Sequence, residues 1–435
     1  MLSTKFSRYD IISQQEKSLR RMVKYGEKNS PWIKRQLKEA GLRADDIRSR
    51  EDLSKIPFTT KDTLRENYPF GLLACPLDKV VRFHASSGTT GKSTVVYYTK
   101  DDIDIWSGLM ARVLKTTGLT NKDIMQIIYN YGFFTGGFGF HYGAEKLGVS
   151  VIPSGSGNTK KQLEIMRDFN TTSFTSTPSY ALHLAEVAQE EGVDPERDLK
   201  LRQGVFGGEP WTDSLRKQIE GAFGIDAYDN YGLSEMCGPG LACECEEKDG
   251  LHFWDDYFIL EVIDPDTGEV LEDGERGELV FTPLWKEAMP LLRYRTRDIS
   301  RIITDECECG LPFGRIERIT GRSDDMLIIK GVNIFPSQIE EVISKHPAFQ
   351  GHYQILVEKR GYMDALTINM EVTNNLFSGN LRDLLRVQKE LEESIRSTFF
   401  ISADVKLVEE GSMPRSVGKA QRVIDLRGDN NDNRS

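Results

Sequence analysis

Ala85-Ser86-Ser87-Gly88-Thr89-Thr90-Gly91-Lys92-Ser93-Thr94 is the segment on which the interpretation of this chain depends. Its flanks, residues 80–83 and 95–99, are rich in β-branched and aromatic residues, which predicts strand, loop and strand. Glycines let backbone N–H groups approach an anion, while the hydroxyls and the lysine add donors and charge. The composition therefore suits a loop that holds phosphate, although it also suits a surface turn.

The loop nearly matches the P-loop pattern G-x-x-x-x-G-K-[ST]. Counting back from Gly91-Lys92-Ser93, the first glycine should stand at position 86, where the chain has Ser86. A P-loop also opens a helix, whereas residues 95–98 have the composition of a strand. We therefore predict a phosphate loop outside the P-loop NTPase class.

Composition narrows the class of protein. The chain has 435 residues, long enough for more than one domain, and a net charge of -11, which argues against a broad nucleic-acid surface. No apolar run approaches the ~20 residues that span a bilayer. Residues 1–7 have no apolar core, so we expect no signal peptide and a cytoplasmic protein.

The order of the predicted elements indicates an α/β fold. Residues 8–45 are mostly helical in pattern, with Pro31 at the start of a second helix. Short strands and helices then alternate between residues 124 and 223, which predicts a mostly parallel sheet covered by helices. Ligands bind at the carboxyl ends of such strands, where residues 207–209 and 228–235 are expected.

The pattern of predicted secondary structure changes at two further points along the chain. Strands predicted at 259–263 and 277–282, joined by Asp/Gly turns, indicate a β-subdomain within the large N-terminal domain. From residue 327 the pattern strand, helix, strand, strand, helix, strand predicts a small C-terminal α+β domain of ferredoxin-like type.

The six cysteines are too few for a disulfide framework in a chain of this length. Cys245, His252, Cys307 and Cys309 could form a closed Cys₃His zinc site of structural type. Cys243 is a rival for Cys245, because it belongs to the same Cys-x-Cys pair. The alternative is that these cysteines are small buried apolar residues.

With these motifs in view, the chain resembles the adenylate-forming superfamily and, within it, is most similar to the phenylacetate–coenzyme A ligases. The resemblance covers nearly the whole chain, and the Asn-Ile-Phe-Pro variant and short length favour this branch over longer acyl ligases. Five segments carry it in order: Ser86-Ser87-Gly88-Thr89-Thr90-Gly91-Lys92, Tyr231-Gly232-Leu233-Ser234-Glu235, Arg293-Tyr294-Arg295-Thr296-Arg297-Asp298, the run from Gly321-Arg322-Ser323-Asp324-Asp325 to Asn333-Ile334-Phe335-Pro336, and Pro414-Arg415-Ser416-Val417-Gly418-Lys419.

The resemblance implies a two-step ligase that is active in phenylacetate catabolism. The carboxylate of an aryl acid, with phenylacetate as the implied substrate, attacks the α-phosphate of ATP and gives acyl-adenylate and pyrophosphate. The thiol of coenzyme A then displaces AMP. Because the first step builds negative charge at phosphorus, cations and N–H donors are needed there.

The same resemblance assigns the nucleotide site. The opening loop, Ser86 to Lys92, would hold the β- and γ-phosphates, and Thr90 and Glu235 match ligands of Mg²⁺, a cation that prefers oxygen. A solvated loop glutamate is the alternative for Glu235. Asp298 matches the carboxylate that accepts the ribose hydroxyls, and Arg322 a ribose or phosphate contact. The residues that would surround adenine are Gly207, Gly208, Glu209, Tyr228, Asp229, Asn230 and Tyr231, and Gly232 is a further expected cofactor-binding residue.

The resemblance also assigns a mobile part. Lys419 matches the catalytic lysine that bridges the acid and the α-phosphate, although by itself it would be read as an exposed tail lysine. Asp324 lies in an expected hinge, residues 322–326, between an N-terminal domain (1–321) and a C-terminal domain (327–435). In this family the small domain swings, so that Lys419 leaves and a thiolation face arrives. We expect a homodimer that binds neither nucleic acid nor membranes.

Residues 131–141 mix aromatic residues with glycines. Aromatic walls with glycine gaps suit a flat aryl acid, and a tight corner of the core is the alternative. The residues expected to line the acid pocket are Tyr131, Phe134, Gly136, Phe140 and His141.

Three other functions stay open from the sequence. An enzyme that loads an aryl acid onto a carrier protein would share the first step but would not need free coenzyme A. A regulatory nucleotide-binding protein would not need Glu235, Asp298 and Lys419 together. A P-loop NTPase would hydrolyse ATP without any acid.

Overall fold

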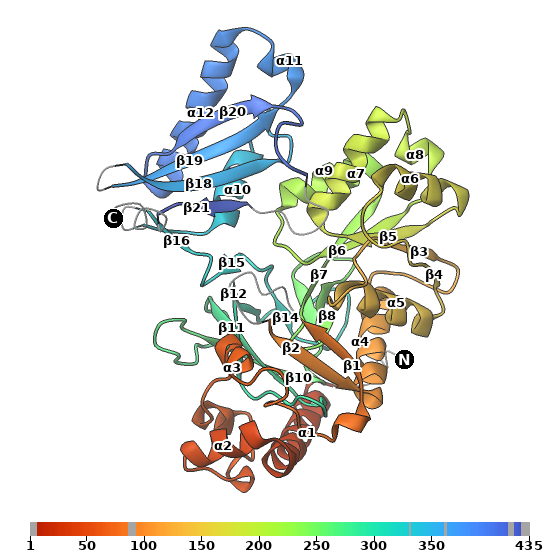
Figure 1. Cartoon of the computed structure of the whole chain (residues 1–435), viewed down its shortest axis with the longest axis vertical. Coiled ribbons are helices and arrows are strands. Elements are labelled where there is room, and N and C mark those ends of the chain that lie inside the picture. The colour runs from red at the N-terminus through yellow and green to blue at the C-terminus, as the bar shows by residue number, and fades with distance from the viewer. Residues whose placement is uncertain (1–6, 86–92, 330–331, 361–362, 416–421, 428–435) are drawn as a thin grey trace, which may run out of the picture.

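The computed structural model describes residues 7–85, 93–329, 332–360, 363–415 and 422–427. Figure 1 shows a large N-terminal part and, in blue, a smaller C-terminal part that meets it along one side. This confirms the predicted α/β fold class, with a large N-terminal and a small C-terminal α+β domain.

Two helices, α1 (Arg8–Asn29) and α2 (Pro31–Glu39), come first. The Ser30 side chain accepts a hydrogen bond from the backbone N–H of Ile33, and Pro31 occupies the first turn of α2 as predicted. Shorter helical segments follow: Ala44–Asp46, Glu51–Lys55, α3 (Lys61–Glu66) and Leu77–Lys79.

The largest sheet of the described residues has nine strands in the order β13-β14-β9-β8-β7-β6-β5-β3-β4. The strands β4, β3, β5, β6 and β7 are parallel, as predicted, and the remaining four pair antiparallel. Their bounds are β3 Ile124–Ile127, β4 Ser150–Ile152, β5 Ser173–Ser176, β6 Gln203–Gly207, β7 Asp226–Leu233, β8 Gly238–Glu244, β9 Leu251–Phe253, β13 Ile302–Ile303 and β14 Arg315–Ile316.

Helices cover both faces of the parallel half. Successive residues of β6 show this, because Val205 packs in the core that contains α4 and α5, whereas Phe206 packs in the core that contains α6, α7 and α9. The helices are α4 Lys100–Thr116, α5 Gly136–Leu147, α6 Thr159–Asp168, α7 Pro178–Glu190, α8 Pro195–Asp198 and α9 Asp213–Phe223.

Two smaller sheets complete the large domain. The predicted β-subdomain is a four-stranded sheet in the order β10-β11-β12-β15, with bounds Phe258–Ile263, Gly277–Pro283, Tyr294–Ser300 and Gly321–Arg322. The strands on either side of the opening loop, β1 (Val80–Ala85) and β2 (Val95–Thr99), pair antiparallel, with Ala85 opposite Val95. The prediction of strand, loop and strand is therefore confirmed for the two flanks.

The C-terminal domain differs from the predicted ferredoxin-like order. Its sheet runs β20-β19-β18-β21, with bounds Asp404–Glu409, Met363–Val372, Tyr353–Arg360 and Val423–Asp425, and its helices are α10 Pro336–Ser344, α11 Asn374–Phe377 and α12 Leu381–Phe399. The expected first strand, β16 (Leu327–Ile329), pairs instead with β17 (Val332–Ile334) in a separate hairpin. The third and fourth expected strands, β19 and β20, pair directly with each other, and β21 adds a further edge strand that pairs parallel to β18.

Each domain has its own hydrophobic core. One buried cluster contains only residues from Leu327 onward, including Ile355, Ile368 and Leu391. The other three clusters are built from residues before β15. In the part of the chain that the structure describes, no helix is both long and apolar enough to cross a membrane.

Candidate active site

The opening loop leads into a buried contact with Glu235. The loop itself, Ser86 to Lys92 with the predicted magnesium ligand Thr90, lies outside the described residues. Just after it, Thr94 is buried, and its hydroxyl donates to Oε1 of Glu235 at 3.4 Å. Thr94, two residues after the predicted phosphate loop, and the predicted acidic ligand Glu235 are therefore in direct contact, although 141 residues separate them.

Glu235 lies in the turn between β7 and β8, with only 6% of its surface exposed. Below this turn Lys286 is wholly buried, and its Nζ donates to the backbone carbonyl of Glu235 at 2.9 Å. Burial lowers the pKa of Lys286 to about 8. Burial and then the charge of Glu235 raise the pKa of the Tyr294 phenol well above its usual value.

Sequence reasoning gave Lys286 and Tyr294 no role, although a lysine between the apolar residues Leu284-Trp285 and the mostly apolar segment 288–292 was a usable signal.

The expected ribose site is assembled from three strands. Asp298 on β12 accepts a hydrogen bond from the Tyr231 hydroxyl on β7 at 2.6 Å. Arg322 on β15 lies directly opposite Asp298 in the sheet, and its Nη1 donates to Oδ1 of Asp298 at 3.3 Å. Arg322 also holds both carboxylate oxygens of Asp324 at 2.9 and 3.0 Å. This arrangement links Asp298, the predicted ligand of the ribose hydroxyls, to the expected hinge.

Backbone shape explains the glycines at the end of β6. A Cβ on Gly207 would lie 2.2 Å from the backbone oxygen of Asn230, and Gly208 has a φ of +86°. Glu209 next to them caps α7, because its Oε1 accepts a hydrogen bond from the backbone N–H of Ser179 at 2.7 Å. Asn230 is buried, and its Oδ1 has no protein partner among the described residues, which leaves an acceptor for a ligand.

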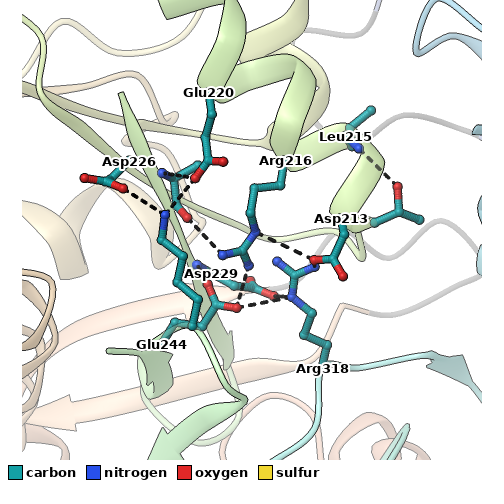
Figure 2. Close-up of polar contacts among 11 residues, drawn as sticks. Asp213, Leu215, Arg216, Glu220, Asp226, Asp229, Glu244 and Arg318 are labelled. Carbon is teal, nitrogen blue, oxygen red and sulfur yellow. Dashed lines mark hydrogen bonds and ion pairs between the residues drawn. The ribbon is translucent and has the colours of Figure 1, made fainter. Parts of the chain in front are cut away.

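A network of acidic side chains and arginines lies beside β7 (Figure 2). Glu244, at the end of β8, accepts hydrogen bonds from Arg216 of α9 at 2.5 Å and from Arg318 at 3.2 Å. Its other oxygen accepts the backbone N–H of Asp229 at 2.7 Å. The Asp229 carboxylate also lies near Arg318, at 3.8 Å. Burial raises the pKa of both Asp229 and Glu244.

Asp229, predicted to bind nucleotide, therefore has its carboxylate in this network. Gly232, further along β7, allows a close approach, because a Cβ there would lie 2.0 Å from the oxygen of Gly238.

The residues expected to line the acid pocket form two groups. Gly136 and Phe140 of α5 lie against Tyr129, whose ring stacks on Phe140 at 5.6 Å. The Tyr129 hydroxyl donates to the backbone oxygen of Gly207 at 3.0 Å, which joins this group to one of the residues predicted to surround adenine. Tyr131 and His141 form a second pair, with the hydroxyl and Nδ1 3.2 Å apart. Phe134 is 45% exposed.

Arg415 connects the two domains. It precedes Lys419, which lies outside the described residues, by four positions. Its guanidinium donates to Glu371 of β19 at 2.8 and 2.9 Å and to Glu186 of α7 at 3.0 Å. Nε2 of His352 lies 2.8 Å from the same Glu186. Burial alone would raise the pKa of Glu186, but hydrogen bonds from His183 and His352 and the charge of Arg415 lower it overall. Sequence reasoning quoted Arg415 without a role and missed Glu186.

The predicted metal ligands come together as a cluster. The ligand atoms of Cys245, His252, Cys307 and Cys309 all lie within 4.8 Å of one another. Cys243, the rival for Cys245, is not part of this cluster and packs in the hydrophobic core of the large domain.

Comparison with known families and proteins places this site in context. Residues 25–283 match the family described as AMP-binding enzyme, and residues 331–427 match the AMP-binding enzyme C-terminal domain. The phenylacetate-coenzyme A ligase of Escherichia coli is 48% identical over 96% of this chain and 95% of that protein. The enzyme of the same name from Thermus thermophilus is 44% identical over 97% of both chains.

Solved structures add information about the arrangement of the domains. A 2-hydroxyisobutyryl-CoA ligase in its postadenylation state is 28% identical and has a TM-score of 0.90, covering 96% of this chain and 89% of that one. The same enzyme in its thioesterification state, with coenzyme A, has a TM-score of 0.70, with 96% and 90% covered. The higher score indicates that the two domains of this chain are arranged as in the postadenylation state.

Proposed function

Because this chain belongs to the AMP-binding enzymes and, among them, to the phenylacetate–coenzyme A ligase family, we propose that it activates phenylacetate or a closely related aryl acid. The acid and ATP give acyl-adenylate and pyrophosphate, and coenzyme A then gives aryl-acyl-CoA and AMP. The observation that carries the proposal is that Tyr231, Asp298 and Arg322, which come from three separate strands, are joined by direct hydrogen bonds. Glu235, in the turn that follows β7, accepts a hydrogen bond from Thr94, just after the opening loop.

The residues present fit an adenine nucleotide. Oδ1 of Asn230, for which the described part of the chain offers no hydrogen-bond partner, suits the amino group of adenine, and Gly207 and Gly208 keep side chains away from that edge. Asp298, held by Tyr231 and Arg322, suits the ribose hydroxyls. The opening loop, Ser86 to Lys92, would hold the β- and γ-phosphates.

Glu235 and Thr90 would hold Mg²⁺, because a buried carboxylate and a hydroxyl suit that ion. When bound, Mg²⁺ neutralises charge on the phosphates.

In the first step, an oxygen of the substrate carboxylate forms a bond to the α-phosphorus, and pyrophosphate leaves. We propose that Lys419 bridges these two groups and stabilises the charge that develops there. In the second step, the coenzyme A thiolate attacks the acyl carbon, and AMP leaves with the bonding electrons. Lys419 has no part in that step, because the small domain (327–435) turns about residues 322–326 relative to residues 1–321.

The acid is expected to lie near Tyr129 and the glycine edge of α5. Gly136 faces the Tyr129 ring, and the hydroxyl of Tyr129 is held by the ends of β5 and β6. A fixed aromatic wall beside a glycine suits a flat aryl group, which supports an aryl acid. We also propose that the enzyme is a homodimer and acts in phenylacetate catabolism. The cysteine–histidine cluster takes no part in either step.

The test is a panel of aryl and alkyl acids, assayed for AMP release with and without coenzyme A. We expect the highest turnover with phenylacetate or a near relative, and turnover that depends on coenzyme A. Acid-dependent exchange of pyrophosphate into ATP is expected in either case, because adenylation precedes the thiol step. Exchange without any stimulation of AMP release by free coenzyme A would favour loading of a carrier protein instead. ATP hydrolysis without any acid would contradict the proposal.

Lys419→Ala separates the two steps. We expect adenylation to fall by at least a hundredfold, because the charge at phosphorus loses its cation, while thioester formation from supplied acyl-adenylate is retained. Lys406→Ala, at an exposed position in the same domain, is the matched control and should leave both rates unchanged. An equal loss in both steps would show that the role given to Lys419 is wrong.

A further inference from the structure

Four potential metal ligands converge away from the adenylation residues. Cys245 immediately follows β8, and His252 lies on β9, which pairs with β8. Cys307 and Cys309 belong to the connection between β13 and β14. Cys245 and His252 are buried, and the other two are half-buried. Three separate segments therefore deliver three thiols and one imidazole to one point.

The distances fit a bound ion and not a disulfide. The Sγ atoms of Cys245 and Cys307 are 3.6 Å apart, whereas a disulfide requires about 2.05 Å. Two thiolates on one tetrahedral zinc, each about 2.3 Å from it, lie roughly 3.8 Å apart. Sγ of Cys309 and Nε2 of His252 are 3.2 Å apart, so the imidazole nitrogen also faces the centre of the cluster.

The orientation of His252 is fixed by its other ring nitrogen. Nδ1 lies 3.1 Å from the backbone oxygen of Phe313, a group that can only accept. Nδ1 therefore carries the proton and donates it, which leaves the lone pair of Nε2 directed at the three sulfur atoms. Histidines that bind metals are held in this way by a partner on the far side of the ring.

We propose that Cys245, His252, Cys307 and Cys309 bind one Zn²⁺ ion in a closed, structural site. Thiolate and imidazole ligands select zinc over magnesium or calcium, and four protein ligands leave no open position for a substrate. The ion fastens the connection at residues 304–314 to the ends of β8 and β9. Glu244, the centre of the network beside β7, is the residue next to Cys245. The zinc site thus holds the end of β8, whose Glu244 contacts the predicted nucleotide-binding strand β7. The zinc proposal does not depend on which acid the enzyme uses.

Metal analysis of the full-length protein, purified without chelator, is the first test. We expect about one zinc per chain in the wild type and in Cys75→Ser, a cysteine outside the cluster. The double variant Cys307→Ser/Cys309→Ser should lose the zinc. Wild-type protein without zinc, or a double variant that keeps it, would overturn the proposal.

A second measurement covers the case in which the double variant fails to fold. Growth with Co²⁺ in place of zinc should give the wild type the intense thiolate-to-cobalt absorption and the visible bands of a tetrahedral ion. A spectrum of octahedral Co²⁺ without thiolate absorption would contradict the assigned ligands.

Removal of the ion by chelator should lower the Tm of the large domain by several degrees, on the order of 5 °C, and added Zn²⁺ should restore it. An unchanged Tm after verified zinc loss would overturn the structural role.

Discussion

At the scale of single residues, Lys286 has the most unusual environment near the proposed site. Its ammonium is wholly buried, donates to the carbonyl of Glu235 and lies 4.8 Å from the centre of the Tyr98 ring. The folded chain holds its proton with a pKa of about 8, against 10.5 for an ordinary lysine. Between these pH values the unfolded chain binds more protons, so the contribution of Lys286 to stability rises with pH.

We predict that the unfolding free energy of the wild type, minus that of Lys286→Met, increases by about 3 kcal/mol as the pH rises from 8 to 10.5. Below pH 8 both states are protonated and the difference is constant. Denaturant titrations followed by tryptophan fluorescence report on the large domain, because all five tryptophans lie before residue 321. Lys286→Arg, which keeps its charge over this range, is the control; parallel curves for wild type and Lys286→Met would contradict the shifted pKa.

At the scale of elements, the network around Glu244 joins α9, β7 and β8 to the segment after β14. Removing one charge from a buried ion pair leaves its partners uncompensated, which costs on the order of 3 kcal/mol. We therefore predict that Glu244→Gln destabilises the large domain by about that amount. It should also raise the KM for ATP several-fold, since the backbone of Asp229 loses a charged acceptor.

Asp198→Asn is the control for Glu244→Gln, because the pair that Asp198 forms with Arg197 is on the surface, and it should leave the stability nearly unchanged. Thermal unfolding together with ATP-dependent initial rates would measure both effects. Equal changes in the two variants would show that burial of Glu244 does not matter.

The same scale shows where sequence reasoning succeeds. Alternating strands and helices, the β-subdomain and the strands around the opening loop follow from local composition and periodicity, and these predictions are confirmed. The partner of a strand is harder to predict: Leu327–Ile329 is expected in the C-terminal sheet, yet it forms a local antiparallel hairpin with β17, which begins three residues after it ends. β21 has three residues and pairs with β18 far away in the sequence, so nothing local indicates it.

In the candidate site, too, some residues could be predicted from the sequence and others could not. Motif order led to Glu235, Asp298 and Arg322, because those residues stand in recognisable segments. Lys286, Thr94 and Glu186 act through contacts with residues more than fifty positions away, which no spacing rule reveals. The sequence could not decide between Cys243 and Cys245, because both belong to one Cys-x-Cys motif. In the structure, only the sulfur of Cys245 joins the cluster.

At the scale of the whole molecule, the ion cluster around Arg415 holds the two domains together. Arg415 and Glu371 both belong to the small domain, and Glu186 is the contribution of the large one. Because the lowered pKa of Glu186 keeps it ionised at neutral pH, its contribution to this contact is present above pH 4.5. It is lost as the pH falls below that value, through the lowered pKa. The contact belongs to the arrangement that matches the postadenylation state.

Replacing Glu186 by Gln should therefore shift the domains away from this arrangement. Hydrogen bonds to charged groups contribute about 1.5–3 kcal/mol, so the equilibrium between arrangements should change by at least about tenfold. We predict slower adenylation and unchanged or faster thioester formation from supplied acyl-adenylate, because the variant weakens a contact of the arrangement that matches the postadenylation state. Small-angle scattering and proteolysis within residues 322–326 would detect the shift directly. Glu190→Gln, at an exposed position on the same helix, should change neither rate, and a matching loss there would attribute the effect to α7 itself.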